Sequence, residues 1–174
     1  MSKSLYCIGK QTGHQMVMEV CNKTSPTPAK RISIVSIKMI REGSILYNTR
    51  KILSPSDAVN LGKYFLEDAD REKLIACCMD TKNQPISINI VSIGSLNSSI
   101  VHPREVFKAA ILSNAASILI FHNHPSGNTE PSQEDITITK RLKEAGKLIG
   151  IELLDHIIIG SKGKYCSLKE NGTL

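Results

Sequence analysis

The segment from residue 117 to residue 135 decides the expected fold and reads SILIFHNHPSGNTEPSQED. It opens with SILIF, a short apolar run typical of a buried strand. A polar loop with one glycine and two prolines follows over residues 122–131. Ser132 then precedes Asp135 by three residues, which is the capping pattern of a helix start. The segment therefore predicts a buried strand that runs into a loop and then into a helix.

Helices and paired strands are expected on both sides of this segment. Ser54 before Pro55 predicts a helix start, and Pro103 predicts another helix that ends near Asn114. The apolar run LIACCMD after Glu72 predicts a strand buried on both faces, and the alternation in PISINIVSI predicts its hairpin partner. Farther on, the helix that begins at Ser132 is expected to end near residue 150. Two last strands, LLDHIIIG and KYCSL, follow it. Helices interleaved with hairpins predict the α+β class, with a mixed β-sheet flanked by helices.

The first part of the chain differs from the rest in composition. Residues 1–30 end in a turn-rich stretch with two prolines, NKTSPTP, and predict a loosely ordered lead-in. The stretches RISIVSIKMI and ILYNTRKIL flank a Glu42-Gly43-Ser44 turn and predict a β-hairpin. We therefore divide the chain into an N-terminal extension over residues 1–51 and one domain over residues 52–174.

This N-terminal extension is basic. Residues 1–52 carry nine Lys or Arg and two Glu, a balance of +7, in a chain whose net charge is +6. Such asymmetry indicates an acidic partner, either nucleic acid or an acidic protein surface. The alternative is a solvated basic arm with no dedicated partner, because no aromatic stacking set or helical basic stripe accompanies the charge.

Composition excludes several classes of protein. Hydrophobic residues make up 41% and charged residues 22% of the 174 residues, so one globular domain with a modest extension fits and a disordered chain does not. No apolar run approaches the roughly 18 residues needed to cross a bilayer, and the first residues lack the apolar core of a secretory signal. We expect a soluble cytoplasmic protein with no membrane partner. The five cysteines include no CxxC pair, which argues against a disulfide framework and against a thiolate zinc site.

Three side chains of the central segment have the chemistry of metal ligands. His122 and His124 are one residue apart at the end of the expected strand, and Pro125 breaks the regular geometry so that both rings can converge. Asp135, in the first turn of the next helix, can fold back as a third ligand. Three protein ligands with one open position describe a catalytic zinc site. Each piece also has an ordinary explanation, since an HxH pair arises by chance and Asp135 fits a capping box that would compete with the metal.

The segment resembles the JAMM motif of the MPN metallopeptidase superfamily, and the chain from about residue 31 onward is similar to the bacterial RadC family. This resemblance implies an MPN/JAB fold, which is cytidine-deaminase-like, and a Zn²⁺ ion held by His122, His124 and Asp135. It also implies that Ser132 lies near the reacting carbonyl and that a glutamate from an earlier strand is the general base. The resemblance is carried by VHPREV at residues 101–106, HNHPSG at 122–127 and LDHIIIG at 154–160.

The chain departs from the family pattern in two places. Relatives that cleave ubiquitin isopeptide bonds usually have Ser or Thr between the two histidines, whereas this chain has Asn123, so their substrate does not carry over. RadC proteins commonly carry a helix-hairpin-helix DNA-binding unit ahead of this domain, and residues 1–52 show no such pattern. We therefore expect a form that lacks the helix-hairpin-helix domain.

Glu72 is the candidate for the general base. It stands fifty residues before His122, at the start of a buried strand, which is similar to the family's placement of its glutamate. Glu105 is the alternative, although a carboxylate in the first turn of a helix has an ordinary explanation in the helix dipole. His156, beside Asp155, is either a group that supports the metal ligands or contacts substrate, or a satisfied core histidine, which its apolar neighbours Leu154 and Ile157 favour.

These observations lead to two hypotheses for the function. The first is a zinc-dependent hydrolase of amide bonds, peptide or isopeptide, that acts on a peptide or protein substrate. The second is an accessory protein associated with DNA repair that binds nucleic acid through residues 1–52, or a metal-dependent nuclease that combines both properties. An open coordination position together with Glu72 favours the hydrolase, since a structural metal site needs neither.

Overall fold

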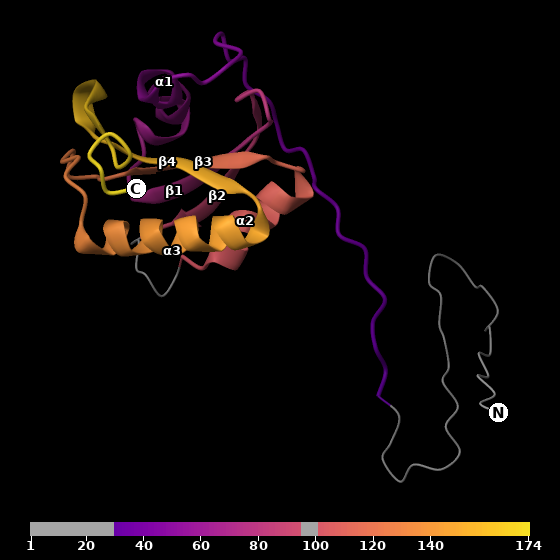
Figure 1. Ribbon diagram of the computed structural model, residues 1–174. Coiled ribbons are helices and arrows are strands. Elements are labelled where there is room, and N and C mark those ends of the chain that lie inside the picture. The colour runs from indigo at the N-terminus through magenta and orange to yellow at the C-terminus, as the bar shows by residue number, and fades with distance from the viewer. Residues whose placement is uncertain (1–29, 95–100) are drawn as a thin grey trace, which may run out of the picture. The chain divides into compact units, whose positions relative to one another are not determined.

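The protein folds as a five-stranded sheet between helices, as seen in a computed structural model that describes residues 30–94 and 101–174. Helix α1 covers one face of the sheet, and α2 and α3 cover the other face (Figure 1). The predicted α+β class, with a mixed sheet flanked by helices, is confirmed. The elements in chain order are α1 (Pro55–Leu66), β1 (Lys73–Met79), β2 (Pro85–Ile93), α2 (Pro103–Leu112), β3 (Ser117–Asn123), α3 (Gln133–Ile149), β4 (Glu152–Ile159), the 3-10 turn η1 (Ser161–Gly163) and β5 (Tyr165–Ser167).

The strand order β2-β1-β3-β4-β5 explains how the candidate site is assembled. Strand β1 is antiparallel to both of its neighbours, β2 and β3. Strands β3 and β4 are parallel, so the chain must cross from the end of one to the start of the other, and α3 fills this crossover. The first turn of α3 can therefore lie beside the end of β3, where the two histidines are.

The core is aliphatic and has two layers, one on each face of the sheet. Leu74, Ala76 and Cys78 of β1 pack with α2 and α3, whereas Ile75 and Cys77 pack with α1. The strand is therefore buried on both faces, as its apolar run predicts. Burial also raises the pKa of the Cys77 thiol to about 12, so this cysteine is an inert core residue.

Helix starts follow the signals that predict them. Ser54 caps α1 by accepting from the Asp57 amide, and the Asp57 carboxylate accepts from the Ser54 amide in return. Pro55 occupies the first helical position, where its missing N–H costs nothing. At the other end of the domain, α3 stops at Gly150, which adopts a left-handed conformation with φ of 80°.

The predicted β-hairpin over residues 31–53 is wrong, because none of the described residues before α1 forms a strand. A lone two-stranded hairpin buries too little surface to be stable in water. Accordingly, Ile34, Ile40 and Leu46 are 65, 85 and 84% exposed. Regular contacts with the domain begin close to α1, where the Ile52 amide donates to the Asn83 carbonyl at 2.9 Å. The lead-in expected over residues 1–30 lies, except for its last residue, outside the described residues.

Strand β2 is one edge of the sheet and is only partly covered. None of its nine residues is charged, and Ile86, Ile90 and Ile93 are 45, 47 and 58% exposed. Ile88 alone of these alternating isoleucines packs against the α1 layer. The reason is that α1 lies over β3 and β4 rather than over the edge.

Within the described residues, no helix is long and apolar enough to cross a membrane.

We predict that Gly146→Ala destabilises the domain. A Cβ at this position of α3 would lie 2.5 Å from the backbone oxygen of Ile151 and 3.2 Å from Cζ of Phe107. Because backbone cannot move aside cheaply, we expect a loss of about 1–3 kcal/mol and a Tm lowered by roughly 3–10 °C in thermal unfolding. Gly62→Ala in α1 is the comparison variant, since its Cβ would meet side-chain atoms of Ile159 and Phe121 but no backbone, and should therefore cost less than Gly146→Ala. Gly→Ala raises the Tm where a helix position is open to solvent. A higher Tm for Gly146→Ala would therefore contradict the close contact between α3 and Ile151.

Candidate metal centre

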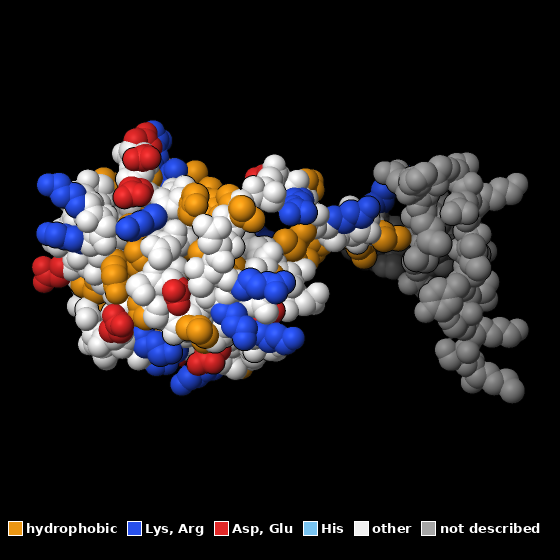
Figure 2. Space-filling model, turned by 90° about the horizontal axis from the view of Figure 1, so that it is seen from above, with side chains coloured by type: hydrophobic (Ala, Val, Ile, Leu, Met, Phe, Trp, Pro, Cys, Tyr) orange, Lys and Arg blue, Asp and Glu red, His pale blue; other side chains and the backbone are white. Residues whose placement is uncertain are grey.

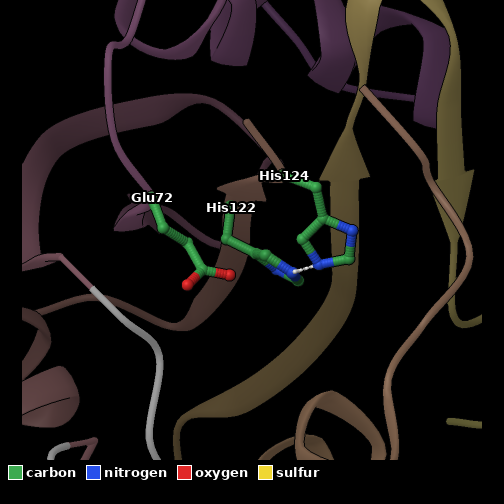
Figure 3. Close-up of side chains that lie close together, drawn as sticks. All are labelled: Glu72, His122 and His124. Carbon is green, nitrogen blue, oxygen red and sulfur yellow. Dashed lines mark hydrogen bonds between the residues drawn. The ribbon is translucent and has the colours of Figure 1, made fainter. Parts of the chain in front are cut away.

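His122 and His124 converge at the end of β3. His122 is the next-to-last residue of the strand and is completely buried, whereas His124 follows the strand and is partly exposed. Their Nε2 atoms lie 3.0 Å apart (Figure 3). The two rings therefore meet as their one-residue spacing predicts, with a bend of the chain directly after the strand.

The Asp135 carboxylate completes a group of three ligand atoms. Its Oδ1 lies 3.2 Å from Nε2 of His122, and its Oδ2 lies 3.4 Å from Nε2 of His124. An ion bound tetrahedrally at about 2.0–2.1 Å from each ligand would separate the ligand atoms by about 3.3–3.4 Å. The observed separations are thus close to those of ligands around one ion, with a different oxygen of Asp135 facing each histidine.

A chain of hydrogen bonds behind His122 fixes which of its nitrogens carries the proton. The Thr139 hydroxyl donates to the Asp135 carbonyl at 2.6 Å, because a carbonyl can only accept. The hydroxyl oxygen then accepts from Nδ1–H of His156, whose Nε2 must accept from Nδ1–H of His122 at 2.8 Å. This order leaves Nε2 of His122 without a proton and with its lone pair directed at Asp135 and His124.

The loop after β3 does the same for His124. Its Nδ1 donates to the Asn128 carbonyl at 2.8 Å, so its Nε2 also carries a free lone pair. Gly127 turns this loop with φ of 75°, and a Cβ there would lie 2.6 Å from Oγ of Ser161. The loop is therefore packed against the turn after β4, and it holds the imidazole from its far side.

Electrostatics at the site favour binding of a cation. Burial alone would raise the pKa of the Asp135 carboxyl, but the neighbouring His122 and His124 rings, which in their protonated form donate to the carboxylate, outweigh it and hold this pKa far below its usual range. The hydrogen bond to Asp135 raises the pKa of His124, against the effect of burial. Complete burial keeps the pKa of His156 well below its usual value, so this ring is neutral. Two facing lone pairs beside a carboxylate need a positive charge between them, which a metal ion or a proton supplies.

Ser132 is the N-cap of α3 and is bonded to Asp135 in three ways. The Ser132 amide and hydroxyl both donate to Oδ2 of Asp135, at 2.8 and 2.7 Å, and the hydroxyl accepts from the Asp135 amide. The expected competition between cap and metal is thereby avoided, because the cap uses Oδ2 and leaves Oδ1 toward His122. The single hydroxyl proton of Ser132 is directed at the carboxylate in this arrangement.

Glu72 lies on the other side of the histidines. It immediately precedes β1, and one of its carboxylate oxygens lies within 4.8 Å of ligand nitrogens on both His122 and His124. Figure 3 shows the side chain extending toward the two rings. By contrast, Glu105 of α2 pairs with Lys108 at 2.6 Å and with Arg104 at 3.4 Å on the surface. Two sets of three ligands thus share the histidines, one completed by Asp135 and the other by Glu72.

Two residues at the site were missed by sequence reasoning. Thr139 connects Asp135 to His156, and its only signal is a position one helical turn after Asp135 on the buried face of α3. Asn123 lies between the histidines and bonds to the main chain on both sides of Glu72. His156 is both things that the sequence allowed, a satisfied core histidine and a support for His122.

Comparison with known proteins assigns the family. A family model described as the RadC-like JAB domain matches residues 52–173. The chain belongs to the RadC family. The three stretches that resemble RadC proteins start α2, hold both candidate histidine ligands and form most of β4 with His156.

Curated relatives support this membership. A UPF0758 protein of Methanosarcina barkeri is 54% identical over 123 residues, which cover 71% of this RadC-family chain and 53% of the relative. A UPF0758 protein of Clostridium acetobutylicum is 57% identical over 128 residues, with 74% and 56% covered. A UPF0758 protein of Clostridium botulinum is 47% identical, over 95% of this chain and 76% of the relative. The chain spans about half the length of the first two of these relatives.

We predict that Thr139→Val weakens metal binding without unfolding the domain. The change keeps the shape of the side chain but removes the oxygen that accepts from His156, so the proton order that frees Nε2 of His122 is lost. Metal affinity should fall about 10–100-fold, measured by titration against a chromophoric chelator. Thr137→Val is the matched control, because the Thr137 hydroxyl makes the same type of bond to Gln133 on the exposed side of α3. Equal affinities for the two variants would remove Thr139 from this role.

We also predict that metal affinity falls on acidification because of His124. Protons and metal compete for its Nε2, and its pKa is raised above the ordinary 6.5, so protonation begins at higher pH than for a free histidine. Asp135 stays ionised throughout this range. Affinity should therefore be complete above the pKa of His124 and fall by about tenfold for each pH unit below it. Metal titrations between about pH 5 and pH 8 measure this slope, and a constant affinity over that range would contradict it.

Proposed function

We propose that the protein is a zinc-dependent hydrolase of amide bonds, peptide or isopeptide, with His122, His124 and Asp135 as the zinc ligands. One observation carries the proposal. Two proton-free imidazole nitrogens and the Asp135 carboxylate lie 3.0–3.4 Å from one another, close enough to bind one ion, and a second carboxylate, that of Glu72, lies beside the histidines. Nitrogen and oxygen donors of this kind suit zinc.

Asp135 is favoured over Glu72 as the third ligand. Asp135 is 2% exposed, touches both Nε2 atoms at 3.2 and 3.4 Å, and is fixed by Ser132. Glu72 lies within 4.8 Å of ligand nitrogens on both histidines, and we propose that it acts beside the ion as the general base rather than as the third ligand. Three protein ligands then leave one coordination position open, as catalytic zinc sites require.

When bound, zinc would supply Lewis acidity, polarising an amide carbonyl and lowering the pKa of a water molecule toward about 7. The chain's own residues would move the protons. Glu72 accepts a proton from the attacking water as the new C–O bond forms, holds it on its carboxylate, and donates it to the amide nitrogen as the C–N bond breaks. The base is thereby regenerated, and the products are a carboxylic acid and an amine.

Ser132 has a positioning role in this arrangement. The resemblance to JAMM proteins implies that this hydroxyl lies near the reacting carbonyl. Its proton is directed at Oδ2 of Asp135 at 2.7 Å, so it would have to rotate away before it could donate to an oxyanion. We therefore propose that Ser132 chiefly orients Asp135, and that stabilisation of the oxyanion by its hydroxyl needs that rotation.

Nucleic acid is a second proposed partner, through the basic residues 1–52. Most of this segment precedes the described residues, so the proposal rests on its charge of +7. On the face of the protein drawn in Figure 2, Lys and Arg side chains are interspersed with Asp and Glu rather than gathered in one basic patch. On this face, the distribution gives phosphate binding no support.

The proposal predicts that Glu72→Gln keeps the metal and loses hydrolysis. Glutamine preserves the shape of the side chain but cannot take a proton, so turnover of a peptide or isopeptide library should fall at least 100-fold. Zinc content should stay near one ion per chain in this variant and be lost in His122→Ala and Asp135→Asn. Glu105→Gln is the matched control, because Glu105 is paired with Lys108 on the surface and should be dispensable.

The same assay separates the competing activities. Retained amide hydrolysis in Glu72→Gln would remove Glu72 from the role of base. Cleavage of DNA instead of peptides, abolished by the same ligand variants, would favour the nuclease. A full complement of zinc with no hydrolysis by the wild-type chain on any amide would overturn the proposed function.

A further inference from the structure

We propose that Asn123 is a positioning residue. Its side-chain amide takes the place of the last backbone hydrogen-bonded pair between β1 and β3 and thereby holds Glu72 in place. The inference rests on the proposed function, because it concerns how the side chain of Glu72, the proposed general base, is oriented. It assigns a role to the residue between the two histidines, which contributes no ligand to the ion.

The ladder between β1 and β3 ends one residue before Asn123. The last backbone pair is Leu74 with His122, and the next pair would join Lys73 to Asn123. At this point the side chain takes over. Oδ1 of Asn123 accepts from the Lys73 amide at 2.8 Å, and Nδ2 of Asn123 donates to the Arg71 carbonyl at 3.1 Å.

The amide is suited to this task by its chemistry. It offers one acceptor and two donor hydrogens in a plane, so it can bond a strand as a peptide group would. An aspartate could accept from Lys73 but would repel the Arg71 carbonyl, and a leucine of similar shape could do neither. Asn123 is only 4% exposed, so its side chain is not a surface for substrate.

Glu72 is consequently fixed on both sides of its main chain. Asn123 holds the carbonyl before it and the amide after it, while the Glu72 carbonyl accepts from the Gly94 amide at 2.8 Å at the end of β2. The backbone at Glu72 therefore has little freedom, and its side chain leaves β1 toward the histidines (Figure 3). Meanwhile β3 keeps its other neighbour, since Asn123 still pairs with Ile159 of β4.

This arrangement resolves a conflict within β3. The chain must leave the sheet directly after Asn123 so that His124 can turn back onto His122. If the backbone ladder simply stopped, the start of β1 would lose its neighbour on the β3 side at the residue that carries the base. A side chain with peptide-like hydrogen bonding lets β3 turn away without releasing Glu72.

The experiment uses the full chain loaded with Co²⁺, whose visible spectrum reports the surroundings of the ion without any substrate. Removing the negative charge of Glu72 from beside the ion should lower the pH at which solvent at the ion gives up its proton, so Glu72→Gln should move the spectral midpoint to lower pH. Asn123→Leu should move the midpoint in the same direction, and adding it to Glu72→Gln should produce no further shift. Hydrogen exchange of the Lys73 amide should become roughly tenfold faster in Asn123→Leu.

Two further variants guard the interpretation. Asn123→Ser is smaller, uncharged and polar, so it should fold even where leucine does not, and because it lacks the side-chain amide it should shift the midpoint in the same direction. Asn89→Leu, in β2 opposite Ala76, removes an amide from the same sheet away from the ion and should leave the midpoint unchanged.

The outcomes separate this inference from the proposed function. If Glu72→Gln leaves the midpoint where it is in the wild type, Glu72 is not beside the ion, and the proposed base and this inference both fail. If Glu72→Gln moves the midpoint and neither Asn123 variant does, only the role of Asn123 is overturned. Loss of Co²⁺ from the Asn123 variants, as in His122→Ala, would likewise overturn it, because a positioning residue for the base is not required to bind the ion.

Discussion

The contact between the first turn of α3 and the end of β3 is the constraint on which the site depends. It brings Asp135 to within 3.4 Å of ligand nitrogens on residues that precede it by more than ten positions. The parallel pairing of β3 with β4 requires a crossover at this edge, and α3 provides it. Ser132 then fixes the carboxylate by the same hydrogen bonds that begin the helix. One helix start thus serves both folding and the proposed chemistry.

Buried polar groups behind His122 are acceptable because each has a partner. His122, His156 and Thr139 are essentially inaccessible to solvent, and Nδ1 of His122, both ring nitrogens of His156 and the Thr139 hydroxyl are all hydrogen-bonded. Their bonds run in one direction, from the ring of His122 to the carbonyl of Asp135. A fully satisfied network of this kind is rigid, and a rigid ligand loses less entropy when it binds an ion.

Much of the fold could be predicted from sequence because its signals are local. The capping residues Ser54 and Ser132 begin their helices as expected, and the run after Glu72 is a strand buried on both faces. Where tertiary packing decides, prediction was poorer. The helical spacing of Leu142, Ala145 and Leu148 favours one buried side for all three, but Leu148 is 90% exposed, because the buried face of α3 runs through Ile138, Leu142 and Gly146. The position of Thr139, one helical turn after Asp135, does not reveal its role, since nothing in a sequence tells a structural hydroxyl from one that directs a proton.

The edge at β2 has a consequence for how the protein behaves in concentrated solution. Sheets usually discourage unwanted strand addition by placing lysine, proline or a strong bend at their margins. Strand β2 has a proline only at its first position and no charge anywhere, with isoleucine side chains open to water, whereas Lys164 and Lys169 flank β5 at the opposite margin. The two edges of the sheet therefore differ in how readily they accept another strand. The β2 edge is uncharged and apolar, whereas positive charge at the β5 edge disfavours pairing.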